Sequence, residues 1–210
     1  MTKAISSLGT ALALFACASP AIGSDDLFAP VLAYEAGLPR ERPPACLATR
    51  TEGAAFDRDR QNIRSLREAR PLNPRDAEIF RQHLAAADTR QFDWRLPVPL
   101  GERWLEGVAR VDPEQARELD AAARSAIAAE LAQTPSLAID RSTVPPGLQA
   151  RGALRRCSRL TLTAPFVTGD IAFIETNYVC GGLCGNGWLY ALRRQEGRWR
   201  LVAIAFTWIS

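Results

Sequence analysis

Residues 158–210 read SRLTLTAPFVTGDIAFIETNYVCGGLCGNGWLYALRRQEGRWRLVAIAFTWIS, and this stretch decides the fold. Short runs of β-branched, aromatic and aliphatic residues alternate in it with glycine-bearing segments, which is typical of strands joined by turns. Two turns are expected at residues 168–170 and at Glu196 and Gly197. The stretch therefore predicts four consecutive antiparallel strands.

The last of these strands, residues 199–208, carries apolar residues on both faces. This pattern predicts a central position in the sheet, because a strand covered on both faces has no polar side. Ala203 and Ala205 make one face small, so a helix is expected to pack closely against it.

Upstream of the sheet, two segments carry strong signals for the start of a helix. Asn73 precedes Pro74, and Asp112 precedes Pro113, so each proline follows a residue type that caps helix N-termini. A shorter helix is expected to end before Pro71. The expected helices cover residues 61–69, 74–87 and 113–133.

These elements predict an α+β domain over residues 71–210, with helices packed on one face of a C-terminal four-stranded antiparallel β-meander. Residues 24–70 are expected to form a Pro/Arg-rich extension. Within it, residues 25–58 are expected to be irregular, because their four prolines oppose a long helix.

Residues 1–23 are typical of an export signal. Lys3 precedes an uncharged, largely apolar run that is too short to remain in a bilayer as a helix. Cleavage is expected after Ala18 or after Gly23. Lipidation of Cys17 is an alternative, because residues 14–17 form a degenerate lipobox, and it would anchor the protein to a membrane. We expect an exported protein, periplasmic or extracellular, whose only membrane contact would be that lipid.

The charge of the chain argues against nucleic acid as a partner. Lys3 is the only lysine among 26 basic residues, and there are 23 acidic residues. Removal of the signal therefore leaves a net charge near +2, with arginines spread among acidic residues. The densest small cluster, Arg151, Arg155 and Arg156, is expected to be a solvated basic face, because no aromatic residues for base stacking are interleaved with it.

Four cysteines remain if Cys17 is removed with the signal. An even number in an oxidising compartment predicts two disulfides, which four cysteines can form in three ways. We favour Cys180 with Cys184, as a clip across a loop, and Cys46 with Cys157, which would tie the N-terminal extension to the start of the sheet. No metal site and no cofactor are expected.

The segment CGGLCGNG, residues 180–187, is followed by an aromatic strand, a Gly-Arg-Trp hairpin and a terminal Trp-Ile-Ser. In these features the chain resembles a family of uncharacterised bacterial exported proteins with a C-terminal CGxLCGxG segment. The resemblance covers about 50 residues at the C-terminus. It implies a shared C-terminal sheet and no particular activity.

Two groups of residues are candidates for a ligand or loop site. Glu175 and Asn177 share a face of one predicted strand, where a buried carboxyl group would have a raised pKa. Alternatively, Glu175 lies at the solvent-exposed end of the strand or pairs with Arg193. The glycines of the Cys loop could form an anion-binding nest or simply a tight turn around a disulfide. These glycines are Gly181, Gly182, Gly185 and Gly187.

No constellation in the sequence identifies an active site. His83 is the only histidine, and a structural or surface role is expected for it. The leading hypothesis is a non-enzymatic envelope protein that binds another envelope protein or a small ligand through the open sheet face or the Cys loop. The alternative is a thiol-disulfide protein that uses Cys180 and Cys184. A third hypothesis is a hydrolase built on Glu175 and Asn177.

Overall fold

The sheet of this protein is mixed, with the strand order β2-β1-β3-β5-β6-β7, and β4 pairs with β5 beside this path. The computed structural model describes residues 24–38, 45–71, 73–97, 109–129, 131, 136–150 and 157–210. The strands are β1 (Ala45–Leu47), β2 (Gln149–Ala150), β3 (Ser158–Leu162), β4 (Phe166–Thr168), β5 (Ile171–Gly181), β6 (Cys184–Gln195) and β7 (Arg198–Ile209).

The α+β class predicted from the sequence is confirmed, and the sheet is larger than expected. Strands β3, β5, β6 and β7 are successive antiparallel neighbours and form the expected meander. Strand β1 adds to it in parallel with β3, and β2 pairs in parallel with β1. The purely antiparallel, four-stranded sheet is therefore corrected to a mixed one, because parallel pairing joins segments that no local turn connects.

Helix α1 (Ser24–Gly37) occupies the region that was expected to be an irregular extension. Pro30 lies inside this helix, although an interior proline costs about 3 kcal/mol. The tertiary packing offsets that cost, because Phe28 and Leu32 are fully buried in one core cluster with Tyr190 of β6. Helix α1, in the first part of the predicted extension, thus belongs to the core of the domain.

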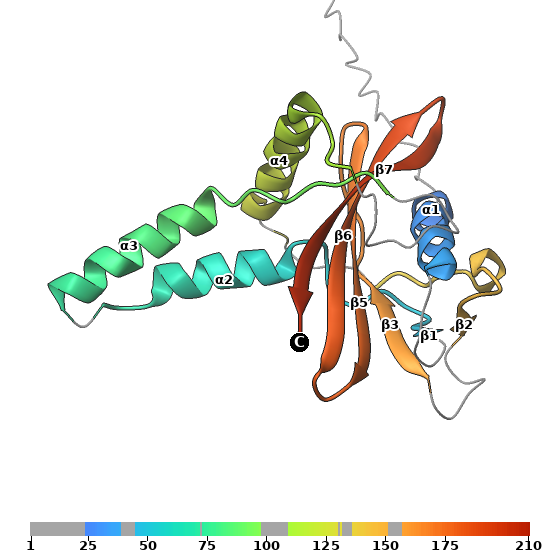
Figure 1. Cartoon of the computed structure of the whole chain (residues 1–210), viewed down its shortest axis with the longest axis horizontal. Coiled ribbons are helices and arrows are strands. Elements are labelled where there is room, and N and C mark those ends of the chain that lie inside the picture. Colours follow the sequence, from blue (N-terminus) through green and yellow to red (C-terminus); the bar gives the residue numbers. More distant parts are fainter. Residues whose placement is uncertain are drawn as a thin grey trace, which may run out of the picture.

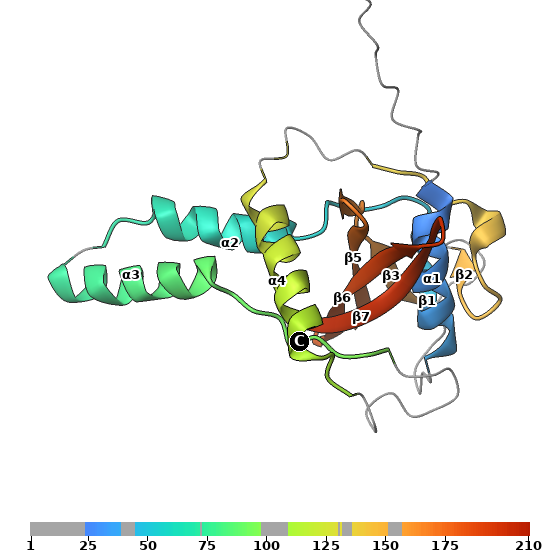
Figure 2. The ribbon, with the colours of Figure 1, turned by 90° about the horizontal axis from the view of Figure 1, so that it is seen from above.

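Helix α4 (Pro113–Ala128) lies on the opposite face of the sheet from α1, so the sheet is the middle layer (Figure 2). The Asp112 side chain accepts hydrogen bonds from the backbone N–H groups of Glu114 and Gln115, as expected of its cap. Leu119 and Ala123 share a second core cluster with Ala203 and Ala205, the small-residue face predicted to receive a helix. The prediction that helices cover one face only was wrong.

Strand β7 lies at an edge of the sheet rather than at its centre. Both of its faces are nevertheless buried, with Ile204 in the core under α1 and Ala203 and Ala205 in the core under α4. Arg95 covers part of this edge by exchanging two backbone hydrogen bonds of 2.8 Å with Ile204. Apolarity on both faces therefore reflects the two helical layers and not a central position.

Helices α2 (Asp57–Glu68) and α3 (Pro74–Asp88) form a hairpin that projects away from the sheet (Figure 1). The start of α3 is as predicted, because the Asn73 side chain accepts a hydrogen bond of 2.9 Å from the Asp76 N–H. Helix α3 has no fully buried residue, and Asp59 is the only one in α2. The hairpin is consequently held to the body mainly at its base.

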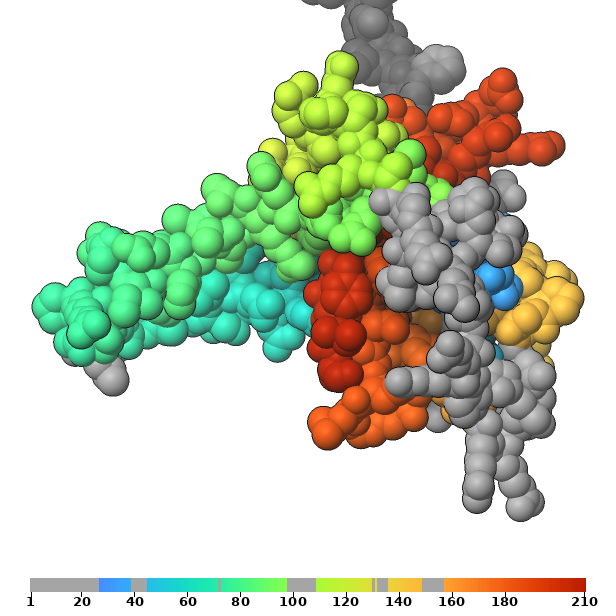
Figure 3. Space-filling view, in the orientation of Figure 1, coloured from blue at the N-terminus to red at the C-terminus, as the bar shows by residue number. Residues whose placement is uncertain are grey.

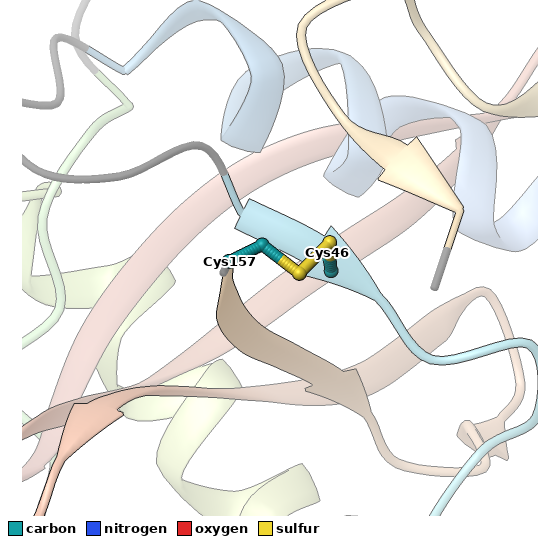
Figure 4. Close-up of a disulfide and its surroundings, with 2 residues drawn as sticks. All are labelled: Cys46 and Cys157. Carbon is teal, nitrogen blue, oxygen red and sulfur yellow. A yellow bond between two sulfur atoms is a disulfide. The ribbon is translucent and has the colours of Figure 1, made fainter. Parts of the chain in front are cut away.

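Two disulfides are formed, with the connectivity that the sequence favoured. Cys46 of β1 pairs with Cys157, just before β3, and their Cα atoms are 5.6 Å apart (Figure 4). Cys180 and Cys184 join the ends of β5 and β6. None of the helices in the described parts of the chain is long and apolar enough to cross a membrane.

Candidate functional site

The hairpin leaves the sheet at Phe56, whose backbone is in the left-handed region with φ 68°. This conformation is unfavourable for a bulky residue, so its surroundings must hold it. The Phe56 ring is fully buried and packs edge-to-face on Phe173, with ring centres 5.1 Å apart. Its N–H donates a hydrogen bond of 2.8 Å to Oε1 of Glu175. The base of the hairpin is thus anchored to β5 by an aromatic contact and a carboxylate.

Glu175 is only 9% exposed, on the face of β5 where the sequence placed it. Burial raises the pKa of this carboxyl group, while the Phe56 N–H and the charges of Arg58 and Arg90 act in the opposite direction. The alternative pairing with Arg193 was wrong. Arg193 contacts Glu118 and Asp170 instead, because the sheet register places it opposite Ile171.

Asn177, two residues further along β5, holds Trp208 of β7. The Asn177 side chain accepts a hydrogen bond of 2.8 Å from Nε1 of Trp208. The Arg58 guanidinium lies over this ring, 5.0 Å from the ring centre. The end of β7 is exposed on the face shown in Figure 3, near the hairpin. Glu175 and Asn177 therefore share a face, and each one already has a structural partner, which weakens the hydrolase hypothesis.

The segment predicted as a Cys/Gly loop is mostly strand. Strand β5 continues to Gly181 and β6 begins at Cys184, so the turn between them is only Gly182 and Leu183. Gly185 and Gly187 lie within β6, and the Trp208 ring rests on both of them. A Cβ atom at Gly187 would be 2.0 Å from Nε1 of Trp208. These two glycines are needed for close packing, and the short turn beside the disulfide favours the tight-turn alternative over an anion-binding nest.

An open groove of about 1280 Å³ lies between α2 and the C-terminal half of α4, and the end of α3 closes one side of it. Helix α4 lies across the base of the hairpin (Figure 2). Arg60 joins the two helices, since its guanidinium donates to the carbonyl oxygens of Ala126 at 2.8 Å and Ala55 at 2.6 Å. It also pairs with Asp57 at 2.8 Å, and its side chain is 11% exposed. Arg60 is therefore a fixed part of the groove.

Charged side chains dominate the lining of this groove, and arginines are in excess over acids. Arg60, Arg67 and Arg90 have acidic partners, namely Asp57, Asp88 and Asp59. Arg64 of α2 and Arg124 of α4 are exposed and form no ion pair with any described residue. The arginines of the lining are Arg60, Arg64, Arg67, Arg90 and Arg124, and its acids are Asp57, Glu68 and Asp88. Within the described part of the chain, the groove thus offers two cations without ion-pair partners, and one acid of its lining, Glu68, likewise has none.

No protein-family model, curated protein or solved structure matches this chain. The site must therefore be interpreted from its own chemistry. Among the described residues, no group of His, Cys, Asp and Glu side chains is arranged to hold a metal ion. His83 is exposed on α3, away from the groove lining.

Sequence reasoning missed two features of the site. The first is the groove itself, although Arg60, Arg64 and Arg67 recur at helical spacing and indicate one basic face of α2. The second is a buried carboxylate on the other face of the sheet. Glu35 of α1 accepts hydrogen bonds from Thr176 at 2.8 Å and from Tyr190 at 2.6 Å. Burial, and then the Glu35 charge, raise the pKa of Tyr190 well above its usual value.

Proposed function

We propose that this protein is an exported, non-enzymatic binding protein that holds a partner protein in the groove between α2 and α4. The single observation that carries the proposal is this groove, which combines exposed cations without partners and apolar side chains at the base of a projecting hairpin. The two disulfides are compatible with export into an oxidising compartment. The predicted signal at residues 1–23, with lipidation of Cys17 as the alternative, lies outside the described residues and belongs to the same proposal.

The alternative, thiol-disulfide exchange at Cys180 and Cys184, has weaker support. The two cysteines join strands at a hairpin end, whereas reactive thiolates are commonly stabilised at helix N-termini or beside cations. Their position does give access, because the adjacent Leu183 is 91% exposed. A redox role predicts that a glutathione buffer near the envelope potential reduces this disulfide, whereas a disulfide that stays oxidised contradicts it.

Photo-crosslinking tests the proposed function. A photo-reactive amino acid is placed at Gln61 or at Ala128, which line opposite sides of the groove and are exposed. The matched control is Leu183 at the tip of the β5–β6 hairpin. The purified proteins are mixed with envelope extract of the organism that makes this protein and are then irradiated. The crosslinked products are identified by mass spectrometry. We expect one common partner from Gln61 and Ala128 and none from Leu183. A partner captured only from Leu183, or equally from all three positions, contradicts the proposal.

A further inference from the structure

The groove has the length of a short helix. Its lining on α2 extends from Asp57 to Glu68, which at 1.5 Å per residue is about 16 Å. Three helical turns of a partner segment have the same length. The flank of α2 forms the long side of the groove, and α4, which lies across the base of the hairpin, lines it only with its last turns from Arg124 on. A helix lying along α2 would therefore also contact the end of α4.

The chemistry of the lining is amphipathic. Ile63 of α2 and Ile127 of α4 are half-buried, and Leu131, beyond the end of α4, is 39% exposed. Arg64 and Arg124 stand on the two helices beside these apolar side chains. A complementary segment would carry leucine-like residues along one stripe and carboxylates on both sides of that stripe. Apolar burial would supply affinity, and the charges would supply specificity and orientation.

Nucleic acid fits this groove poorly. The described lining contains no aromatic side chain on which a base could stack, and three acidic residues contribute to it. The guanidinium groups of Arg64 and Arg124 are also suited to bidentate pairing with carboxylates.

We infer that the groove holds an acidic amphipathic helix of the partner protein. The carboxylates of this helix pair with Arg64 and Arg124, and its apolar stripe covers Ile63, Ile127 and Leu131. This inference rests on the proposed function, since it names the chemistry of the partner that the groove takes.

The experiment measures binding of a synthetic 14-residue peptide of about four helical turns, with leucines on one face and glutamates on its flanks. The probe is fluorescently labelled, and its anisotropy is followed as the full mature protein is added. Two further probes replace all the glutamates by lysine or all the leucines by serine. We expect saturable binding of the acidic probe and at least about tenfold weaker binding of the two others. Raising the salt concentration should weaken the binding of the acidic probe.

Matched variants locate the binding. Arg64→Gln combined with Arg124→Gln should weaken binding of the acidic probe about tenfold. Arg75→Gln is the control, because Arg75 is also an exposed arginine but lies at the far end of the hairpin, outside the groove lining. It should change affinity less than about twofold. Leu131→Ser tests the apolar contact and should weaken binding several-fold.

The outcomes separate this inference from the function on which it rests. No saturable binding of the acidic probe up to about 1 mM, or equal binding of the lysine probe, overturns the inference. An equal loss in Arg75→Gln overturns it as well, since binding would then not depend on the groove. If the inference is overturned but photo-reactive residues at Gln61 and Ala128 still crosslink one common partner, the proposed function stands and the partner has another chemistry. If the crosslinks fail too, both fall.

Discussion

Phe173 and Ile174 lie on opposite faces of β5, and both are fully buried, whereas on α3 Phe80 is half-buried and Ile79 is 44% exposed. The sheet body thus buries apolar residues on two sides, against α1 and α4. The hairpin packs mainly one of its helices on the other and touches the body only at its base, where Arg60 donates to Ala126 of α4. Stability and binding are therefore located in different regions of the molecule. The body supplies the free energy of folding, and it carries a hairpin whose surface remains available for a partner.

The largest expected effect comes from removing one buried aromatic ring in the sheet body, compared with the same change in the hairpin. Phe173→Ala should lower the free energy of unfolding by about 4 kcal/mol, because it removes a fully buried ring that contacts Phe56 and Trp94. The matched change in the hairpin, Phe80→Ala, should cost about 1 kcal/mol, since that ring is only partly buried. Urea unfolding measures both values. Equal costs for the two variants would show that the hairpin belongs to the same core.

A smaller effect is expected where β6 and β7 meet. Gly187→Ala places a methyl group in the position of the Trp208 ring and should cost about 2 kcal/mol through displacement of that ring. The tryptophan fluorescence should change as well, because the hydrogen bond from Trp208 to Asn177 is lost. Gly182→Ala is the control, since a Cβ atom there meets nothing within 4 Å. A similar cost for both glycines would mean that strand propensity and not the Trp208 contact decides the result.

The smallest effect concerns the anchor between the body and the hairpin, and it depends on pH. Burial raises the pKa of Glu175 in the folded protein, whereas glutamic acid in an unfolded chain has a pKa of about 4.3. The carboxyl group of Glu175 therefore stays protonated to a higher pH in the folded protein than in the unfolded chain. Below about pH 4.3, the raised pKa of Glu175 makes its full contribution to the free energy of unfolding. This contribution is lost as the pH rises through the pKa that Glu175 has in the folded protein.

Glu175→Gln removes this ionisation and keeps an oxygen that can accept the Phe56 N–H. Between about pH 4 and pH 8, the unfolding free energy of wild type should therefore decline relative to that of Glu175→Gln. Urea unfolding at several pH values measures the difference. The exposed Glu68→Gln serves as the control and should leave the pH dependence of wild type unchanged. Parallel curves for wild type and Glu175→Gln would contradict a pKa of Glu175 that burial raises in the folded protein.

Local signals in the sequence predicted much of the fold. The starts of α3 and α4 follow from Asn73 and Asp112, and the meander follows from turn chemistry. Helix α1 was not predicted, because tertiary packing overrides the effect of Pro30. Parallel pairing of β1 with β3 has no local signal either, since it joins distant segments.

The candidate site was harder to predict than the fold. Glu175 and Asn177 were placed on the correct face by alternation along β5. Their partners, Phe56 and Trp208, come from other elements and could not be inferred from spacing. The groove depends on α2 lying against α4, and the contact that joins them runs from Arg60 to Ala126, 66 residues further along the chain. A surface that exists only between distant helices leaves no motif in either one.

Hydrogen exchange of the mature protein with and without the acidic amphipathic probe tests most directly that the groove is the binding surface. We expect slower exchange in residues 57–68 and 113–128 when the probe is bound, with no change at the tip of the β5–β6 hairpin. Protection that appears at that tip, or on the sheet but not in α2 and α4, would contradict it.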